Sequence, residues 1–355
     1  MTVTNTNNNI TMRDTNLDIY RALIMIYILC VIHVGFWLKF IDEPLRSLIL
    51  FEMPIIFFIS GAALSVTTKR HSFNKMLIGR FTRIAVPYYV YIVICVAIAF
   101  VLSHFLPDIF KCDLNLKSFV ELTTFRLTEG FAFPFFYHTW FILPYLLIYI
   151  IFWFEQKICD RVNPWLVSVF LLLICIISQI SESSFIKTTA IYNFFFVVGY
   201  QFYKKLRVRT IAYILLSSAL CLTLCLSHDC RMGGVKPMQY YKFAGDIIFL
   251  FYGLTSLSAF SILFSYISIK PNKCLNVWNS KGYTIYLWQN LSFIIVFGIM
   301  KFFPLLNNIL VAMVLIFIIS SLTCFPAHYV ETMIKSIFTR LFKRINHAKE
   351  VLKRV

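Results

Sequence analysis

Long apolar segments separated by short polar ones run along the whole chain. Ten of these segments are apolar enough to cross a hydrocarbon core about 30 Å thick as helices. They lie at 19–40, 46–66, 84–104, 139–154, 164–180, 188–203, 210–227, 247–267, 283–303 and 307–328. The fourth, fifth and sixth are the shortest. The pattern therefore predicts an all-α polytopic membrane protein with about ten transmembrane helices.

Composition supports the same class. Hydrophobic residues make up 59% of the 355 residues and charged residues only 14%, and the mean hydropathy is +0.77. A soluble domain of this length could not bury so much apolar surface. The net charge of +17 would by itself suit a nucleic-acid partner. Because the basic residues lie in short loops between apolar segments, we interpret them as a topology signal instead.

The distribution of Lys and Arg between the two sets of loops predicts the orientation. One set holds 22 of them and comprises the N-terminus, the loops at 67–83, 155–163, 204–209 and 268–282, and the C-terminal tail. The opposite set holds 10. Since basic loops stay in the cytoplasm, we expect both termini to be cytoplasmic. We expect the membrane to be a bacterial inner (plasma) membrane.

The same pattern predicts three regions. Residues 1–18 form a cytoplasmic N-terminal segment, and residues 19–331 form the ten-helix membrane domain. Residues 332–355 are rich in Lys and Arg, which predicts a cytoplasmic tail that forms a helix on the inner leaflet.

Two polar side chains in the first span are the main candidates for chemistry. Arg21 lies near its start, and His33 lies twelve residues later, about 18 Å further along a helix. Such groups are costly in hydrocarbon and persist where they face a bundle interior or water. Snorkelling of Arg21 and a structural role for His33 in the core are the alternatives. Asp18 is placed to pair with Arg21 across one helical turn.

Five basic side chains follow the second span: Lys69, Arg70, Lys75, Arg80 and Arg83. They could satisfy the positive-inside rule alone, or they could bind the phosphates of a coenzyme. We select Lys69, Arg70, Arg80 and Arg83, together with Arg21, as candidate coenzyme-binding residues.

Other polar and aromatic residues interrupt later apolar segments and are candidates for acceptor binding. They are Glu52, His138, Trp140, Tyr286 and Glu331.

These pieces, in this order, resemble the acyltransferase-3 family of integral-membrane acyltransferases. The matching stretches are Leu17–Arg21 with His33, Met53–Gly61, Arg80–Arg83 running into Pro87 and Tyr88, His138–Phe141, Tyr283–Leu287 and Tyr329–Glu331. The resemblance implies a ten-helix acyltransferase bundle. It also implies O-acylation, with acyl-CoA (acetyl-CoA above all) as co-substrate and no metal. The implied acceptor is a hydroxyl of a cell-surface polysaccharide or of its lipid-linked precursor.

The resemblance also implies roles for individual residues. His33 becomes the catalytic base that deprotonates the acceptor hydroxyl, for which an ordinary imidazole pKa near 6.5 is suitable. Arg21 belongs to the coenzyme path, and Arg80 and Arg83 match the family's cytoplasmic basic motif. Direct transfer and an acyl-His33 intermediate both remain open, as do the acceptor sugar and a homo-oligomeric state.

The chain departs from the family pattern at two points. The family usually has ten residues between this Arg and His, and here there are eleven. On a regular helix the extra residue turns His33 about 120° from the face of Arg21. If both groups serve one cavity, we expect a one-residue π-bulge between them. In the ninth span, Gln289 or Asn290 stands near the position where the family often has a His.

Two rival functions remain at this stage. A lipid-linked glycosyltransferase would use acidic residues such as Asp42 and Glu43 in the first outer loop. A transporter or flippase would line its route with Arg21 and His33.

Overall fold

The chain folds as a bundle of helices. The computed structural model describes residues 14–67, 73–105, 115–125 and 136–352, and every regular element in them is helical. In chain order they are α1 (Thr15–Tyr27), η1 (Ile28–His33), α2 (Val34–Trp37), α3 (Leu45–Leu48), α4 (Glu52–Ser65), α5 (Phe73–Phe105), α6 (Leu116–Thr123), η2 (Tyr137–Phe141), α7 (Ile142–Cys159), α8 (Pro164–Ser178), α9 (Ser184–Phe202), α10 (Val208–Met232), α11 (Met238–Ala244), α12 (Ile247–Tyr266), α13 (Lys273–Ser280), α14 (Gly282–Phe302), η3 (Pro304–Leu306) and α15 (Ile309–Leu352).

Each of the ten predicted spans falls on a helix. Eight stretches of the described residues are long and apolar enough to cross a membrane, and α8 is a shorter apolar helix. The predicted span at 188–203 corresponds to α9, which is outside those eight. The prediction of an all-α polytopic membrane protein is confirmed, and α15 extends well beyond the tenth predicted span.

The first span contains the expected irregularity. The six residues of η1 form a π-helix between α1 and α2, with right-handed helical backbone on both sides. A π-turn holds more residues than an α-turn, so it absorbs the extra residue between Arg21 and His33. The predicted bulge is confirmed.

The start of α1 is anchored to the end of α9. Asp14 caps α1 by accepting a hydrogen bond from the Asn16 amide. Its other carboxylate oxygen binds Lys204 Nζ at 2.7 Å. Burial raises the pKa of Asp14, but the hydrogen bond and charge of Lys204 outweigh that effect, so the pKa lies below its ordinary value. This anchor fixes the height of the first span, and with it the positions of Arg21 and His33.

Glycines allow α4 and α9 to pack closely. A Cβ added to Gly61 would lie 1.8 Å from the carbonyl oxygen of Phe196. A Cβ on Gly199 would lie 2.0 Å from the carbonyl oxygen of Phe58. The two backbones therefore touch, as small residues permit in membrane helix pairs. The pairing places α4, which carries Glu52, against α9, which carries Tyr192.

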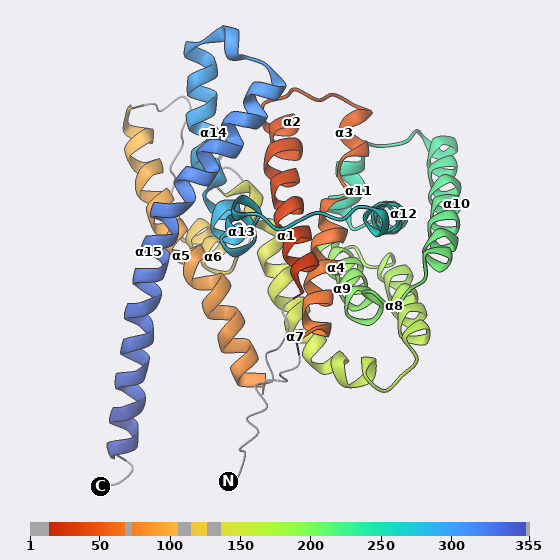
Figure 1. Ribbon diagram of the computed structural model, residues 1–355, viewed down its shortest axis with the longest axis horizontal. Coiled ribbons are helices and arrows are strands. Elements are labelled where there is room, and N and C mark those ends of the chain that lie inside the picture. The colour runs from red at the N-terminus through yellow and green to blue at the C-terminus, as the bar shows by residue number, and fades with distance from the viewer. Residues whose placement is uncertain (1–13, 68–72, 106–114, 126–135, 353–355) are drawn as a thin grey trace, which may run out of the picture.

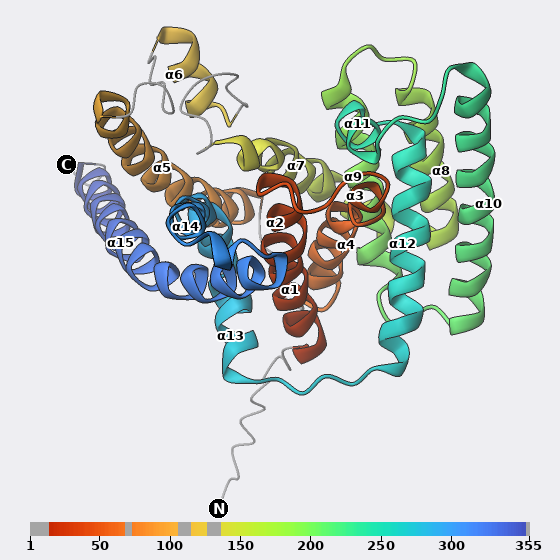
Figure 2. The same cartoon turned by 90° about the horizontal axis from the view of Figure 1, so that it is seen from above.

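The first span lies in the middle of the bundle. Both views place α5 and α15 on one side of α1, and α8 and α10 on the other (Figures 1 and 2). α15 also packs against α14 and η1, and α13 packs against α1. Side chains of η1 therefore face neighbouring helices on several sides.

Two short helices from the long loops join the bundle. α6 lies beside the middle of α5, where the hydroxyls of Tyr88 and Tyr89 donate to the carbonyls of Leu122 and Thr123. α11 packs against α9, α12 and α3. Its first amide donates to Ser47 Oγ at 2.9 Å. As a result, a loop segment places its side chains among the membrane helices.

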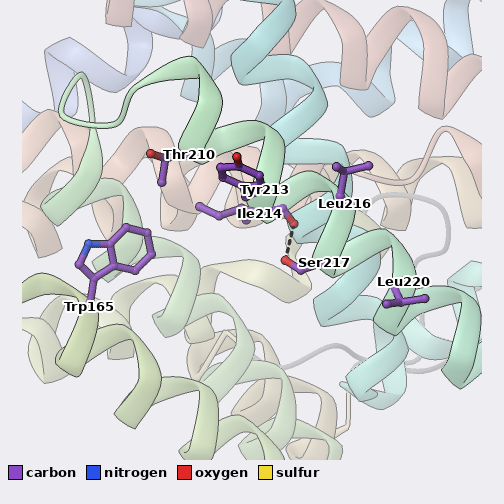
Figure 3. A pocket seen from close by; sticks show the side chains of 7 residues that line it. All are labelled: Trp165, Thr210, Tyr213, Ile214, Leu216, Ser217 and Leu220. Atoms are coloured by element: carbon purple, nitrogen blue, oxygen red, sulfur yellow. Dashed lines mark hydrogen bonds between the residues drawn. The ribbon is translucent and has the colours of Figure 1, made fainter.

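A shallow groove lies on the far side of the bundle from α15, between α8 and α10. It has a volume of about 540 Å³ and is lined mainly by apolar side chains, among them Trp165, Tyr213 and Leu220. Figure 3 shows its one internal hydrogen bond, from Ser217 Oγ to the Ile214 carbonyl. The groove contains no group suited to acid–base chemistry, so it suits a lipid chain.

Candidate active site

His33 occupies a half-buried position at the end of η1. Its Nδ1 lies 2.5 Å from Oε1 of Gln289 on α14. Nε2 of Gln289 donates to the Tyr286 carbonyl, which orients the amide with its oxygen towards His33. We therefore assign the proton of the neutral imidazole to Nδ1, which leaves the Nε2 lone pair to accept a proton. The ring also stacks on Trp37, with centroids 4.3 Å apart.

His138 lies close by but is held differently. Its Nε2 is 3.1 Å from the Leu287 carbonyl, and its Nδ1 is 2.9 Å from Nδ2 of Asn290. A carbonyl requires a donor and an amide NH₂ requires an acceptor, so both ring nitrogens are engaged in the neutral tautomer. The side chain is buried. His138 is therefore placed to position its neighbours rather than to exchange protons.

Tyr286 joins the two histidines. Its hydroxyl donates to the His138 carbonyl at 2.8 Å. Its ring centroid lies 6.2 Å from that of His33 and 5.2 Å from that of His138. The structure thus brings three predicted site residues from three distant parts of the chain together.

Glu331, on α15, forms hydrogen bonds with α14, the helix that carries Tyr286. One carboxylate oxygen accepts from Thr284 Oγ1 at 2.6 Å, and the other accepts from Trp288 Nε1 at 2.9 Å. Both partners lie on α14, so the buried carboxylate ties α15 to α14. Through that contact Glu331 sets the position of Gln289 and Asn290.

Glu52 takes part in a buried ion pair. Its Oε1 binds Nζ of Lys242, which α11 carries into the bundle. The ammonium group also lies 5.7 Å from the ring centroid of Trp140, within cation–π range. Two more predicted site residues, Glu52 and Trp140, therefore share a partner that comes from a loop.

Arg21 and Arg80 form a second group of predicted site residues, apart from the group around His33. Arg21 pairs with Asp18 at 3.7 Å, as its spacing predicted. The guanidinium of Arg80 lies over the ring of Tyr149, 4.3 Å from its centroid. Arg80, on α5, therefore packs on the face of α7 that carries Tyr149, while Arg21 lies on α1 with Asp18 as its ion-pair partner.

Aromatic side chains connect the two groups. Phe141, Tyr145 and Tyr149 follow one another at four-residue spacing, which places them on one face of α7 and its first turn. Neighbouring centroids are 6.3 Å and 5.0 Å apart. Phe141 in turn lies 5.0 Å from Tyr286. A continuous row of aromatic contacts thus runs from Arg80 to Tyr286 beside His33.

Three predicted basic residues remain: Arg83, Lys69 and Arg70. Arg83 is exposed, three residues beyond Arg80. Lys69 and Arg70 lie outside the described residues.

Sequence reasoning missed several residues that complete the site. Gln289 and Asn290 were noted as departures from a pattern, although each bonds one of the histidines. Lys242 was counted only as a loop charge, and Tyr145 was not selected. The one available signal was the cluster of polar residues within the apolar ninth span, where such groups indicate function.

Comparison with known proteins identifies the family of the chain. A family model described as an acyltransferase domain matches residues 14–329. Comparisons with curated proteins and with solved structures give no match. The matched segment holds almost all of the described helices, including His33, Gln289, Tyr286 and His138, and it ends two residues before Glu331. The chain belongs to the acyltransferase-3 family of membrane acyltransferases.

Proposed function

We propose that the protein transfers an acyl group from acyl-CoA to a hydroxyl of a cell-surface polysaccharide or its lipid-linked precursor. Acetyl-CoA is the proposed donor and His33 the proposed base. The observation that carries the proposal is the bond between His33 Nδ1 and Gln289 Oε1. It presents a neutral imidazole with a basic Nε2 at one end of an aromatic row whose other end holds Arg21 and Arg80.

The donor would approach from the Arg end. Coenzyme A carries several phosphate charges, which guanidinium groups recognise through paired hydrogen bonds. Arg80 offers one such group on the face of α7 that carries Tyr149, and Arg21 offers a second one from α1. The row from Tyr149 to Phe141 then gives the thioester arm an aromatic surface that leads to Tyr286 and His33.

The chemistry at His33 follows general base catalysis. Nε2 takes the proton of the acceptor hydroxyl while its oxygen attacks the thioester carbonyl carbon. The tetrahedral intermediate collapses, the carbon–sulfur bond breaks, and the imidazolium returns its proton to the leaving thiolate. Gln289 holds the ring in the required tautomer throughout. Asp18 would act through its ion pair with Arg21 rather than at the reacting atoms.

The proposed orientation follows from the loop charges. With both termini in the cytoplasm of a bacterial cell, Arg21 and Arg80 face the compartment that contains acyl-CoA. His33 then lies about 18 Å further across the membrane, on the side from which a surface glycan approaches. The transfer would therefore take place within the bilayer.

Mass spectrometry of envelope glycans tests the proposal. Cells with the gene should carry glycans heavier by one acyl group than cells without it, and the added mass identifies the acyl group. The same sample shows which sugar unit is modified. Identical glycan masses in the two strains would refute the proposed function.

Replacing Arg80 with Gln should weaken coenzyme binding. We expect about a tenfold loss of affinity, because one charge-assisted phosphate contact is removed. Isothermal titration calorimetry, with coenzyme A added to the purified protein in lipid nanodiscs, measures this affinity. Arg46→Gln is the matched control, since Arg46 also lies over an aromatic ring, 4.8 Å from the Phe36 centroid, but on α3 rather than on α5. Equal affinities for the two variants would contradict the donor route.

Deleting Val31 should convert η1 into a regular helix and preserve the site. With ten residues between Arg21 and the same histidine, the two groups stand about 20° from a common face on an α-helix. We expect glycan acylation to stay within about tenfold of the wild-type rate, since the π-turn only absorbs one residue. Insertion of one Ala between Leu23 and Ile24 is the control. The insertion adds a second extra residue and should abolish acylation. If the Val31 deletion by itself abolishes acylation, the π-turn does more than absorb one residue, and this explanation of η1 is wrong.

A further inference from the structure

The surroundings of Glu52 contain polar atoms that the protein itself leaves without partners. Among the described residues, Oε2 of Glu52 and the hydroxyl of Tyr192 are buried and have no hydrogen-bond partner. Glu52 is 4% exposed and Tyr192 0%. Native proteins rarely leave such atoms unpaired, because each loses its solvation by water without gaining a hydrogen bond in return. Their presence at one place points to a ligand that supplies the missing bonds.

These atoms lie in one part of the bundle. Nζ of Lys242, which binds Glu52, lies 5.7 Å from the ring centroid of Trp140. Tyr192 stacks on Phe57 with centroids 4.6 Å apart, and its ring lies 6.2 Å from that of Trp140. Trp140 keeps part of its surface accessible. Three different helices thus present a carboxylate, a phenol hydroxyl and an indole face to the same region.

The charge of this region selects the kind of ligand. Lys242 binds Glu52 Oε1 and neutralises the carboxylate, so the group as a whole has no net charge. A neutral site with hydrogen-bonding oxygens and an aromatic face disfavours anions and cations. It suits an uncharged ring that carries hydroxyl groups. One ligand hydroxyl would donate a hydrogen bond to Glu52 Oε2, and another would donate to or accept from the Tyr192 hydroxyl. The C–H face of the ring would pack on Trp140.

The region adjoins the proposed base. Trp140 follows His138 by two residues in η2, and the His138 carbonyl accepts from Tyr286, whose ring faces His33. The ring of Trp37 stacks on His33 and lies 6.3 Å from the ring of His138. A ring bound here would hold its hydroxyls near Nε2 of His33.

We propose that Glu52, Tyr192, Trp140 and Lys242 form the acceptor subsite, which binds one neutral pyranose unit beside His33. In it, Lys242 is a positioning residue that orients Glu52, while the other three touch the sugar. The assignment rests on the proposed acyl transfer. It names the acceptor as an uncharged sugar and gives α11 a role in binding it.

Tyr192→Phe tests the subsite because it removes a single oxygen that has no partner in the protein. Tyr89→Phe is the matched control, since the Tyr89 hydroxyl bonds the Thr123 carbonyl away from this region. Three quantities are compared for the full-length protein: the initial rate at which acyl groups appear on envelope glycans after induction, the affinity for coenzyme A in nanodiscs, and the midpoint of thermal unfolding.

We expect Tyr192→Phe to lower the rate about tenfold, the usual effect of losing one buried ligand hydrogen bond. Its coenzyme affinity and unfolding midpoint should match the wild type, and Tyr89→Phe should keep the wild-type rate. A wild-type rate in Tyr192→Phe would overturn the subsite, as would a parallel loss of coenzyme affinity or an unfolding midpoint lowered along with the rate. If the wild-type protein adds no acyl group, the proposed function fails first and the subsite with it.

Discussion

His33→Ala should reduce acyl transfer by at least about 100-fold, the lower range of what a positioned general base contributes. The expected loss is confined to the chemical step, because Arg21 lies about 18 Å away along the first span, Arg80 lies on another helix, α5, and neither is changed. Coenzyme A should therefore bind with wild-type affinity. The rate is measured as acyl groups gained by envelope glycans after induction, at equal amounts of protein in the membrane.

Two comparisons separate a catalytic role of His33 from a structural one. His104→Ala removes an exposed imidazole at the end of α5 and should leave the rate unchanged. Gln289→Met removes the partner of Nδ1 with little change in shape. Because the ring is then free to adopt the wrong tautomer, we expect about a tenfold slower reaction with unchanged coenzyme affinity. Full activity in His33→Ala would show that another group takes the proton.

The first span shows what spacing and a family resemblance predict together. The family usually has ten residues between this Arg and His, and this chain has eleven, which predicted a π-bulge if both groups serve one cavity, because helix geometry fixes the angle between two positions on one helix. The same logic applies to Asp18 and Arg21, which pair within one turn. Contacts within a helix depend on local geometry, so a single sequence contains them.

Contacts between helices were predictable only in part. A small residue such as Gly61 is typical of a position where another helix packs closely. It does not identify which helix that is, so the matching Gly199 on α9 could not be predicted. Gln289 contacts His33 across 256 positions of sequence. That contact depends on how α14 is rotated relative to η1, which periodicity in either helix leaves undetermined. The site was therefore predicted as separate residues, without the bonds that orient them.

Lys242 illustrates a different limit. Its position between two apolar segments assigns it to a loop, where a basic residue ordinarily reports only topology. The chain turns back at α11 and carries the side chain among the membrane helices, where it is 6% exposed. A rule that counts charges in loops cannot distinguish a solvated lysine from one that returns to the interior, so the ion pair with Glu52 was missed.

Lys242→Met should be among the most destabilising single substitutions in the protein. It leaves Glu52 as a buried carboxylate without its cation, a change that costs about 3–5 kcal/mol of unfolding free energy in buried pairs. Unfolding of the purified protein by denaturant in mild detergent measures the loss. Lys204→Met is the matched control, because Lys204 pairs with Asp14 while remaining 54% exposed. Exposed pairs contribute at most about 1 kcal/mol.

A second substitution at Glu52 should reverse most of that loss. In the double variant Lys242→Met with Glu52→Gln, neither member of this pair carries a charge. Replacing both members of a buried ion pair by uncharged groups often changes the free energy of unfolding very little. The two single changes and the double change form a cycle whose coupling measures the pair directly. If Lys242→Met costs no more than Lys204→Met, the pair does not stabilise the bundle. If the double variant regains stability while its glycan acylation remains low, the carboxylate of Glu52 is needed for the acceptor rather than for folding.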